Sequence, residues 1–267
     1  MKYSIREFAE LLGVTVDTLR LYEKYGIINP AKDKRNGYRC FDDFDARDML
    51  MSRWYRSLEF SMQEAAYLTS RAEPEDIISK VQRKRAELDE EIRRKMLLLE
   101  KLTDITTEYS ELNKRVKQCK LRNLPGVYRI SQTEKNSLVK DASLAVIVEE
   151  WMKFLPFVFF SFQIPKGEII SGNRHFNYNW GLAVYEEEAK ELKLKNLERM
   201  EYLPPVRCIS SLIVSSSDYI TSDSISFMFD YVKAAGYKIK GDIFGKIVLS
   251  ENSVAERNTY LEVNIPV

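Results

Sequence analysis

The segment from residue 75 to residue 120 contains neither glycine nor proline and is rich in charged residues. Apolar residues recur in it every three or four positions, so they line one side of a helix in the a and d places of a heptad pattern. This apolar seam includes Ile78, Val81, Leu88, Ile92, Leu99, Leu102, Tyr109 and Val116. A lone helix would leave the seam in water, so we expect a helix over 74–120 that pairs with a second copy of the chain. The alternative is a solvated spacer helix.

The first 30 residues predict two short helices joined by a tight turn. Gly13 ends the apolar pattern of the first helix, and Thr15 is placed to cap the second. Helices joined this closely are typical of a helix-turn-helix, whose second helix enters the major groove of DNA, although helical hairpins without a DNA role are also common. The inner face of the second helix holds Val16, Leu19 and either Leu21 or Tyr22.

A basic hairpin is predicted next. Residues 32–39 carry four basic side chains against one acidic side chain, and Asn36-Gly37 is a strong signal for a tight hairpin turn. A basic hairpin that follows a helix-turn-helix is a wing, and its cations suit DNA phosphates. A solvated charged turn is the alternative interpretation. Two further helices are then expected, the first beginning at Asp42 or Asp43 and the second capped by Ser61.

The bulk composition excludes several classes of protein. The formal net charge of +1 excludes a uniformly basic chain but leaves room for a local DNA-binding face. The N-terminus is amphipathic and charged, unlike a signal peptide. The most apolar run, residues 151–162, is too short to cross a bilayer and contains Lys153 and Pro156. We therefore expect a cytoplasmic protein without a membrane partner.

The N-terminal residues resemble a known family. The stretches SIREFAELLGVTVDTLRLYEKYGIINP (4–30) and RNGYRCFDDFD (35–45) are similar to the winged helix-turn-helix domain of MerR-family transcription regulators. The family pattern is Arg-x-Tyr-Glu-x-x-Gly-Leu-x-x-Pro, followed by Gly-Tyr-Arg-x-Tyr. This chain departs from it at Leu21, where an aromatic is common, at Tyr25, and at Phe41 in place of Tyr. LEFSMQEAAYL (58–68) resembles the family's next helix boundary, with Glu59 in place of Gly and Ala65 in place of Ile.

The resemblance implies a function and a set of contacts. A homodimer with an antiparallel coiled coil would bind double-stranded promoter DNA, bend and untwist it, and so act on RNA polymerase indirectly. A small-molecule effector would shift the dimer between two arrangements. The residues expected at the DNA are Tyr3, Thr15, Thr18, Arg20, Tyr22, Lys34, Arg35, Tyr38 and Arg39.

The C-terminal residues predict an α+β domain. Strands are expected at 127–131, 157–164, 178–186, 206–214, 243–249 and 258–265, and helices at 136–154 and 222–235. That order is β-α-β-β twice, and it implies one sheet with helices on one face and a cleft between the two halves. The expected organisation is a DNA-binding domain at 1–73, a dimerisation helix at 74–120 and an effector-binding domain at 125–267.

This region resembles the gyrase-inhibitor-like effector-binding domain found in some MerR proteins. The matching stretches are VRCISSLIV, FDYVKAAGYKIKGDIF, GKIVLSE and YLEVNIPV. Multidrug-sensing relatives often carry a buried Glu on the strand after the second helix, and Lys246 matches that position here. Aromatic faces suit apolar or cationic aromatic ligands, and an acidic run, Glu186 to Glu188, can supply a carboxylate. The candidate effector-binding residues are Trp151, Trp180, Tyr185, Phe227 and Tyr260.

Other functions remain as alternatives. The C-terminal domain can act as a ligand hydrolase or as a protein-interaction module, but the sequence shows no Ser-His-Asp set and only one His, so we do not expect an enzyme. Metal sensing in this family needs a cysteine cluster near the end of the long helix, and only Cys119 is there. We therefore expect neither a metal site nor a cofactor.

Overall fold

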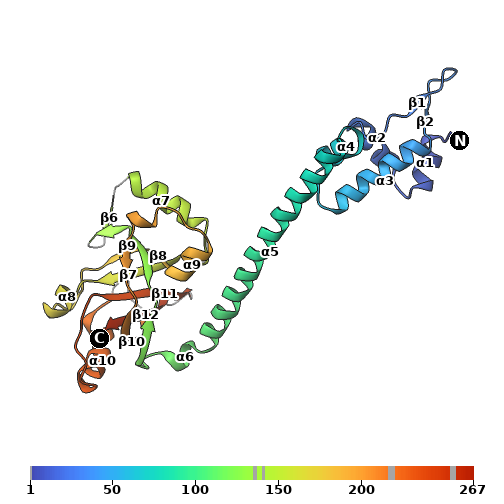
Figure 1. Ribbon diagram of the computed structural model, residues 1–267. Helices are drawn as coiled ribbons and strands as arrows, with labels where there is room; N and C mark the ends of the chain where they lie inside the picture. The colour runs from blue at the N-terminus through green and yellow to red at the C-terminus, as the bar shows by residue number, and fades with distance from the viewer. Residues whose placement is uncertain (1, 135–136, 140–141, 216–219, 253–256) are drawn as a thin grey trace. The chain divides into compact units, whose positions relative to one another are not determined.

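The computed structural model describes residues 2–134, 137–139, 142–215, 220–252 and 257–267 (Figure 1). The chain divides into two compact units, Met1–Met96 and Leu97–Val267. The long helix α5, Pro74–Ser110, contributes residues to both. The two units, called the head and the C-terminal unit below, are described separately.

The head begins with the expected pair of short helices and hairpin. Its elements before α5 are α1 (Ile5–Leu11), α2 (Val16–Lys24), β1 (Ala31–Lys32), β2 (Arg39–Cys40), α3 (Asp43–Ser57) and α4 (Met62–Ser70). The predicted caps at Thr15 and Ser61 are confirmed, and Asp42 rather than Asp43 caps α3. Each cap satisfies a backbone N–H of the first helical turn and contributes about 1 kcal/mol of stability.

A small apolar core holds the head together. Phe8 of α1 stacks on Phe41, with ring centroids 4.7 Å apart, and Leu19 of α2 and Met49 of α3 are buried beside them. Burying side chains of this size contributes roughly 2 kcal/mol each. The core therefore fixes α2 and the base of the hairpin against α1 and α3.

The long helix is shorter than predicted. It ends at Ser110, and the short helix α6 (Leu112–Arg115) follows, so the expectation of one helix through residue 120 is wrong at its C-terminal end. Lys117 has a positive φ of 58°, which stops a helix, and the backbone of Val116 pairs with that of Leu212. Residues 120–124 instead form a strand that the sequence analysis missed.

The C-terminal unit is built on one large sheet. Its strands are β3 (Lys120–Leu124), β4 (Val127–Ser131), β7 (Phe159–Ile164), β8 (Asn179–Tyr185), β9 (Glu201–Leu203), β10 (Val206–Ser215), β11 (Ile243–Asn252) and β12 (Arg257–Pro266). Its helices are α7 (Ala142–Met152), α8 (Lys166–Ile170), α9 (Glu186–Glu191) and α10 (Ser222–Ala234), with a 3-10 turn, η1, at Leu197–Arg199. A small separate hairpin pairs β5 (Thr133–Glu134) with β6 (Ser137–Leu138).

The strand order bears out the predicted internal repeat. The sheet runs β3-β10-β12-β11-β7-β8-β4-β9, so β4-α7-β7-β8 and β10-α10-β11-β12 occupy mirrored halves that meet at β11 and β7. The strand that precedes each half pairs with the other half, since β3 joins β10 and β9 joins β4. The halves are hydrogen-bonded through the β11–β7 pair into one continuous sheet.

The two faces of the sheet differ in polarity. Ile209, Leu261 and Val263 lie under α10, and Ile130 and Leu182 lie under α7, so both helices cover one apolar face. Successive residues of a strand point to opposite faces, so the second face carries the alternate residues. These include Arg129, Ser161, Gln163, Ser210, Lys246, Glu262 and Asn264. We call this second surface the polar face.

The helix expected at 136–154 begins later than predicted. The described helix α7 spans Ala142–Met152, and residues 135–136 and 140–141 lie outside the described residues. Ser137 and Leu138 belong to a strand instead, because they pair with Glu134 and Thr133. A short hairpin of this kind gives no periodic signal, so it was merged with the helix that follows.

Gly181 of β8 provides a test of the sheet. A Cβ atom there would lie 1.8 Å from the carbonyl oxygen of Ile130 on the neighbouring strand. We expect Gly181→Ala to lower the free energy of unfolding by at least about 2 kcal/mol, because the backbone must shift to make room. Urea denaturation followed by circular dichroism measures this. Gly167→Ala in α8, where a Cβ meets nothing within 4 Å, is the matched control. Equal stabilities of the two variants would contradict the described packing.

Candidate DNA-binding head and effector site

The N-terminal part of α2 presents hydroxyl groups and a guanidinium at the surface. The Thr15 Oγ1 accepts a hydrogen bond from the backbone N–H of Thr18, and the two hydroxyl oxygens lie 2.8 Å apart. Arg20 is 63% exposed, and its Nη1 lies 2.8 Å from an oxygen of the exposed Asp17. Exposed ion pairs contribute little to stability, so a phosphate can replace Asp17 as the partner of Arg20.

Tyr22 of α2 is buried in the core of the head. Its predicted contact with DNA is contradicted by this burial, because only 6% of the residue is exposed. Tyr22 follows Leu19 by three positions, which places both side chains on the core face of the helix. Leu21 is 42% exposed instead, which settles the choice between Leu21 and Tyr22 for the inner face.

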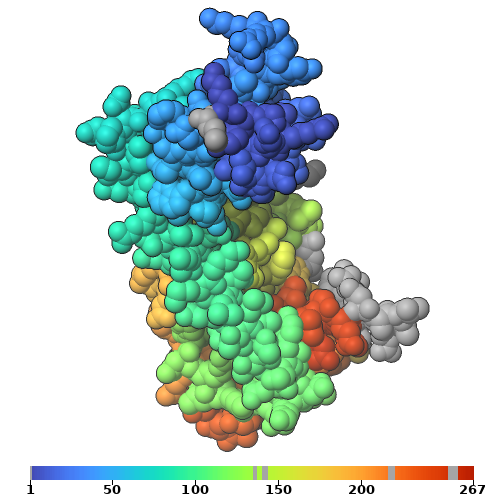
Figure 2. Space-filling model, turned by 90° about the vertical axis from the view of Figure 1, so that its right-hand side faces the viewer, coloured from blue at the N-terminus to red at the C-terminus, as the bar shows by residue number. Residues whose placement is uncertain are grey.

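The predicted basic hairpin is confirmed in the described structure. Strands β1 and β2 pair, and Gly37 has the positive φ of 72° that the turn requires. The hairpin projects from the helices of the head (Figures 1 and 2). Lys34, Arg35 and Tyr38 are exposed in it, Tyr38 by 72%. These three side chains therefore meet the basic requirement for a wing, which is access to a phosphate.

Arg39 connects the wing to α2. Its Nε lies 2.9 and 2.8 Å from the two carboxylate oxygens of Glu23, and the arginine side chain remains 45% exposed. This ion pair joins the second strand of the hairpin to the last turn of the helix. Glu23 belongs to the Arg-x-Tyr-Glu pattern, but its role in the ion pair is not visible in the sequence, because its partner lies 16 positions away.

Tyr3 lies at the base of the wing. Its backbone exchanges two hydrogen bonds with Phe41, at 2.8 and 3.0 Å, and its half-buried ring lies 6.4 Å from that of Phe8. The head thus brings together eight of the nine expected DNA-binding residues on α2, the wing and the segment beside it, and buries only Tyr22.

The five expected effector-binding residues do not form one site. Trp151 is 1% exposed in the core under α7, and the half-buried Trp180 and Phe227 pack against the core under α10. Tyr185 and Tyr260 lie on strand positions of the polar face. Three of the five residues therefore pack in the apolar cores under α7 and α10, and the other two lie on the polar face of the sheet.

A chain of alternating charges crosses the polar face. The Lys246 Nζ lies 3.2 Å from Glu108 of α5, and Glu108 lies 3.6 Å from Arg115 of α6. Arg115 and Arg122 of β3 lie 3.4 and 3.2 Å from the same oxygen of Glu262. The end of α5, α6 and β3 are therefore tied to the centre of the sheet by ion pairs.

Burial and these charges shift the pKa values on the polar face. Burial alone raises the pKa of Glu262, but Lys246, Arg122, Arg115 and a hydrogen bond from Asn264 outweigh it, so the pKa lies below 4.5. Burial raises the pKa of the neighbouring Tyr185 to about 12, so its hydroxyl stays protonated at neutral pH.

Glu262 was missed by the sequence analysis. It is the only charged residue in YLEVNIPV, and this isolated charge in a predicted strand was the available signal.

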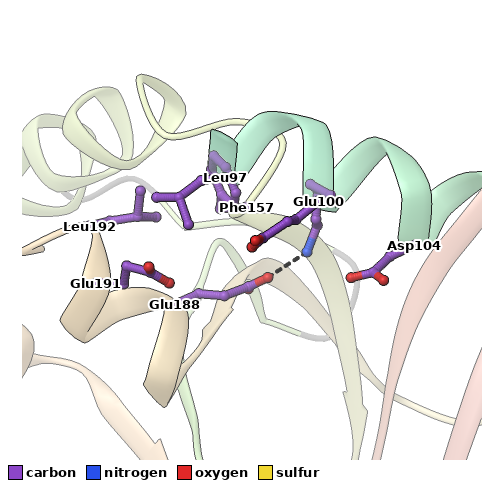
Figure 3. A pocket seen from close by; sticks show the side chains of 8 residues that line it. Leu97, Glu100, Asp104, Phe157, Glu188, Glu191 and Leu192 are labelled. Carbon is purple, nitrogen blue, oxygen red and sulfur yellow. Dashed lines mark hydrogen bonds and ion pairs between the residues drawn. The ribbon is translucent and has the colours of Figure 1, made fainter. Parts of the chain in front are cut away.

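A cavity of about 110 Å³ lies between α5 and α9 (Figure 3). Of the acidic run that the sequence analysis noted, Glu188 faces this cavity, Glu187 is exposed, and Glu186 pairs with Lys190. The cavity is lined by Leu97, Glu100, Lys101, Asp104, Phe157, Glu188, Glu191 and Leu192. Its lining is acidic and apolar, which suits the cationic class of ligand.

Two features are absent from the described residues. In that part of the chain, no three His, Cys, Asp or Glu side chains lie close enough together to hold a metal ion. None of the helices within the described ranges is both long and apolar enough to cross a membrane.

The head defines the chain as a winged helix-turn-helix protein. Residues 4–41 match the family model described as MerR family regulatory protein. The HTH-type transcriptional regulator CueR of Vibrio cholerae is 32% identical over 109 residues, which are 40% of this chain and 76% of CueR. The chain belongs to the MerR family.

Another relative matches a smaller part of the chain, and one solved structure aligns with most of it. The HTH-type transcriptional activator TipA of Streptomyces coelicolor is 35% identical over 68 residues, so the match spans 26% of this chain and about a quarter (27%) of TipA. A cryo-EM structure of an EcmrR–DNA complex aligns over 99% of this chain and 98% of that one, with 19% identity and a TM-score of 0.38. The family model covers only the head, so the resemblance of the C-terminal unit to gyrase-inhibitor-like domains stays a prediction.

The ion chain on the polar face predicts a pH-dependent stability. We expect Glu262→Gln to lower the free energy of unfolding by about 2 kcal/mol at neutral pH. This is less than the usual cost of breaking a fully buried ion pair, because the partner Arg122 is half exposed. The folded pKa of Glu262 lies below 4.5, so its contribution is present above pH 4.5 and is lost as the pH falls through that folded value.

Urea denaturation at a series of pH values measures this difference. The gap between wild type and Glu262→Gln should shrink below pH 4.5, whereas Glu187→Gln, at an exposed position, should match wild type throughout. A gap that is independent of pH would show that Glu262 is not held ionised by its neighbours.

Proposed function

We propose that this chain is a cytoplasmic, homodimeric transcription regulator that binds and distorts double-stranded promoter DNA in response to a small molecule. The observation that carries the proposal is the head, where Thr15, Thr18 and Arg20 are accessible on α2 beside an exposed basic wing. In helix-turn-helix proteins the second helix reads the major groove while flanking cations hold phosphates. RNA polymerase would respond indirectly, through the altered shape of the promoter.

The exposed seam of α5 supports the dimer. Its apolar a and d residues remain accessible along the helix, with Ile78, Ile92 and Leu99 exposed by 58, 49 and 66%. A row of exposed large apolar side chains at heptad spacing is the surface that a second helix covers. A two-fold symmetric dimer would then present two heads to a two-fold symmetric site on DNA.

The C-terminal unit is the proposed sensor. We infer an effector that is a small apolar or cationic aromatic molecule, because the unit combines aromatic side chains with an acidic, partly apolar cavity. Such an effector acts only through different affinities for two arrangements of the dimer. The proposed ranges are residues 1–73 for DNA binding, 74–120 for dimerisation and 125–267 for sensing. The proteins matched over the head are named as transcriptional regulators, which favours this function over hydrolysis.

The DNA contacts can be tested by removing charge. We expect Arg20→Ala and Arg39→Ala each to weaken binding to a DNA fragment that the wild-type protein selects from a random pool. Each should also reduce the salt slope of binding by about 2, one phosphate for each head of the dimer. Fluorescence anisotropy at several salt concentrations measures both quantities.

Arg93→Ala is the matched control for these variants. It removes the same charge from an outward position of α5, next to the seam residue Ile92. Affinity and slope that are unchanged in both head variants would contradict the proposed DNA-binding surface. A loss in Arg93→Ala equal to theirs would show a nonspecific effect of net charge.

The dimer seam can be tested by adding charge. The double variant Leu88→Glu/Ile92→Glu should be monomeric at concentrations where wild type is dimeric, because each lost apolar contact removes roughly 2 kcal/mol and the new carboxylates repel each other. Sedimentation equilibrium measures the molecular mass. Glu90→Lys, on the outer side of the same turn, should remain dimeric. A dimeric double variant would place the dimer interface elsewhere.

A further inference from the structure

Lys101 of the long helix α5 contacts a carboxylate and an aromatic ring of the C-terminal unit. The Lys101 Nζ lies 2.6 Å from one carboxylate oxygen of Glu188 and 5.9 Å from the ring centroid of Phe157. Only 18% of the lysine side chain and 24% of the glutamate side chain are exposed. Phe157 is itself buried, with 7% exposed. The three groups form a cation seat of one carboxylate and one aromatic face, and its cation is an ammonium of the same chain.

One carboxylate oxygen of the cation seat lacks a hydrogen-bond donor, and a cavity lies beside it. The second carboxylate oxygen of Glu188 is buried, and it accepts no hydrogen bond from any residue that the structure describes. A buried carboxylate oxygen without a donor is costly, and the charge of a second or larger cation at the seat would offset part of that cost. The cavity of about 110 Å³ opens at this position, so there is room for a group beyond the lysine ammonium.

The surroundings of the seat favour a cation that carries carbon. Four carboxylates line the cavity, those of Glu100, Asp104, Glu188 and Glu191, against the single ammonium of Lys101. Leu97, Leu192 and the Phe157 ring complete the wall with apolar surface. An alkylated ammonium matches both parts of this lining, since its charge meets the carboxylates and its methyl groups contact the ring and the leucines. Inorganic cations lack the second kind of contact.

We propose that this seat is a binding site for a small organic cation, which replaces the Lys101 ammonium between Glu188 and Phe157. The inference rests on the proposed function, since it assigns the effector of a regulator to one site and one chemical class. Lys101 acts as an internal competitor, so the protein binds such a cation more weakly than the empty seat would.

The position of Lys101 on α5 links the seat to the dimer helix. Lys101 and Glu108 lie seven residues apart, on the side of α5 that faces the C-terminal unit and away from the seam at Leu99 and Leu102. A cation that displaces Lys101 breaks its ion pair with Glu188, while Glu108 still pairs with Lys246 and Arg115. Occupancy of the seat therefore changes how firmly α5 is held to the sensor.

The test is calorimetric titration of the full-length protein with choline at constant ionic strength. Wild type should bind choline but not 3,3-dimethylbutan-1-ol, its uncharged isostere. Lys101→Met, which keeps the apolar stem and removes the competing charge, should bind choline at least about tenfold more tightly. Glu188→Gln and Phe157→Leu should each weaken binding by about tenfold or more. Glu187→Gln, one residue from the seat and exposed, should bind like wild type.

Tighter choline binding by Lys101→Met separates competition from a structural role. If Lys101 only supported the structure of the site, its removal would weaken choline binding. The proposal is overturned if folded Lys101→Met binds choline no more tightly than wild type does. It is also overturned if Glu188→Gln leaves choline affinity unchanged, or if wild type binds the uncharged alcohol as well as choline. If Lys101→Met does not fold by circular dichroism, Glu188→Gln and Phe157→Leu decide the question.

DNA binding is measured on the same preparations. Wild type that selects no DNA sequence contradicts the proposed function, whatever its affinity for choline. Wild type that binds DNA while choline binding ignores Lys101 and Glu188 contradicts the seat alone.

Discussion

The buried carboxylate of Glu262 is the constraint around which the C-terminal unit is arranged. Only 5% of its side chain is exposed, so the charge must be paired by cations from the protein. Arg115 and Arg122 supply the pairing from α6 and β3, the two elements that follow the long helix. These ion pairs therefore help to hold the chain between α5 and the sheet, together with the turn at Lys117.

Ion pairing also distinguishes two sides of α5, one charged and one apolar. Glu108 completes the charge chain by pairing with both Lys246 and Arg115, and Lys101 pairs with Glu188 on the same side of the helix. The seam residues Leu88, Ile92, Leu99 and Leu102 lie at other positions and are exposed. A helix that is ionic toward its own domain and apolar on its exposed side is suited to the proposed dimer, where ligand binding and dimer geometry would share one rigid element.

The head was predictable from sequence to a large extent because its signals are local. Thr15 and Ser61 act within one helical turn, and Asn36-Gly37 acts within one hairpin, so each is visible in a short window. Tyr22 was misplaced because α2 carries two candidate core residues side by side, Leu21 and Tyr22. Only the packing of Leu19, Phe8 and Phe41 decides which of them is buried.

The candidate effector site was less predictable because its residues are distant in sequence. The aromatic candidates were chosen by type, and the sheet separated them, placing Trp151 and Trp180 in the apolar core and Tyr185 on the polar face. The Lys101–Glu188 pair spans 87 positions, and no periodicity connects residues so far apart.

By itself, the sequence determined the winged head, the long helix with its apolar seam and the twice-repeated order of strands and helices, since propensity and periodicity are properties of neighbouring residues. Only the tertiary structure decided where the long helix ends, which face of the sheet carries charge and which carboxylates meet which cations. Those outcomes depend on burial, and burial exists only after strands and helices that are far apart in the chain have packed together.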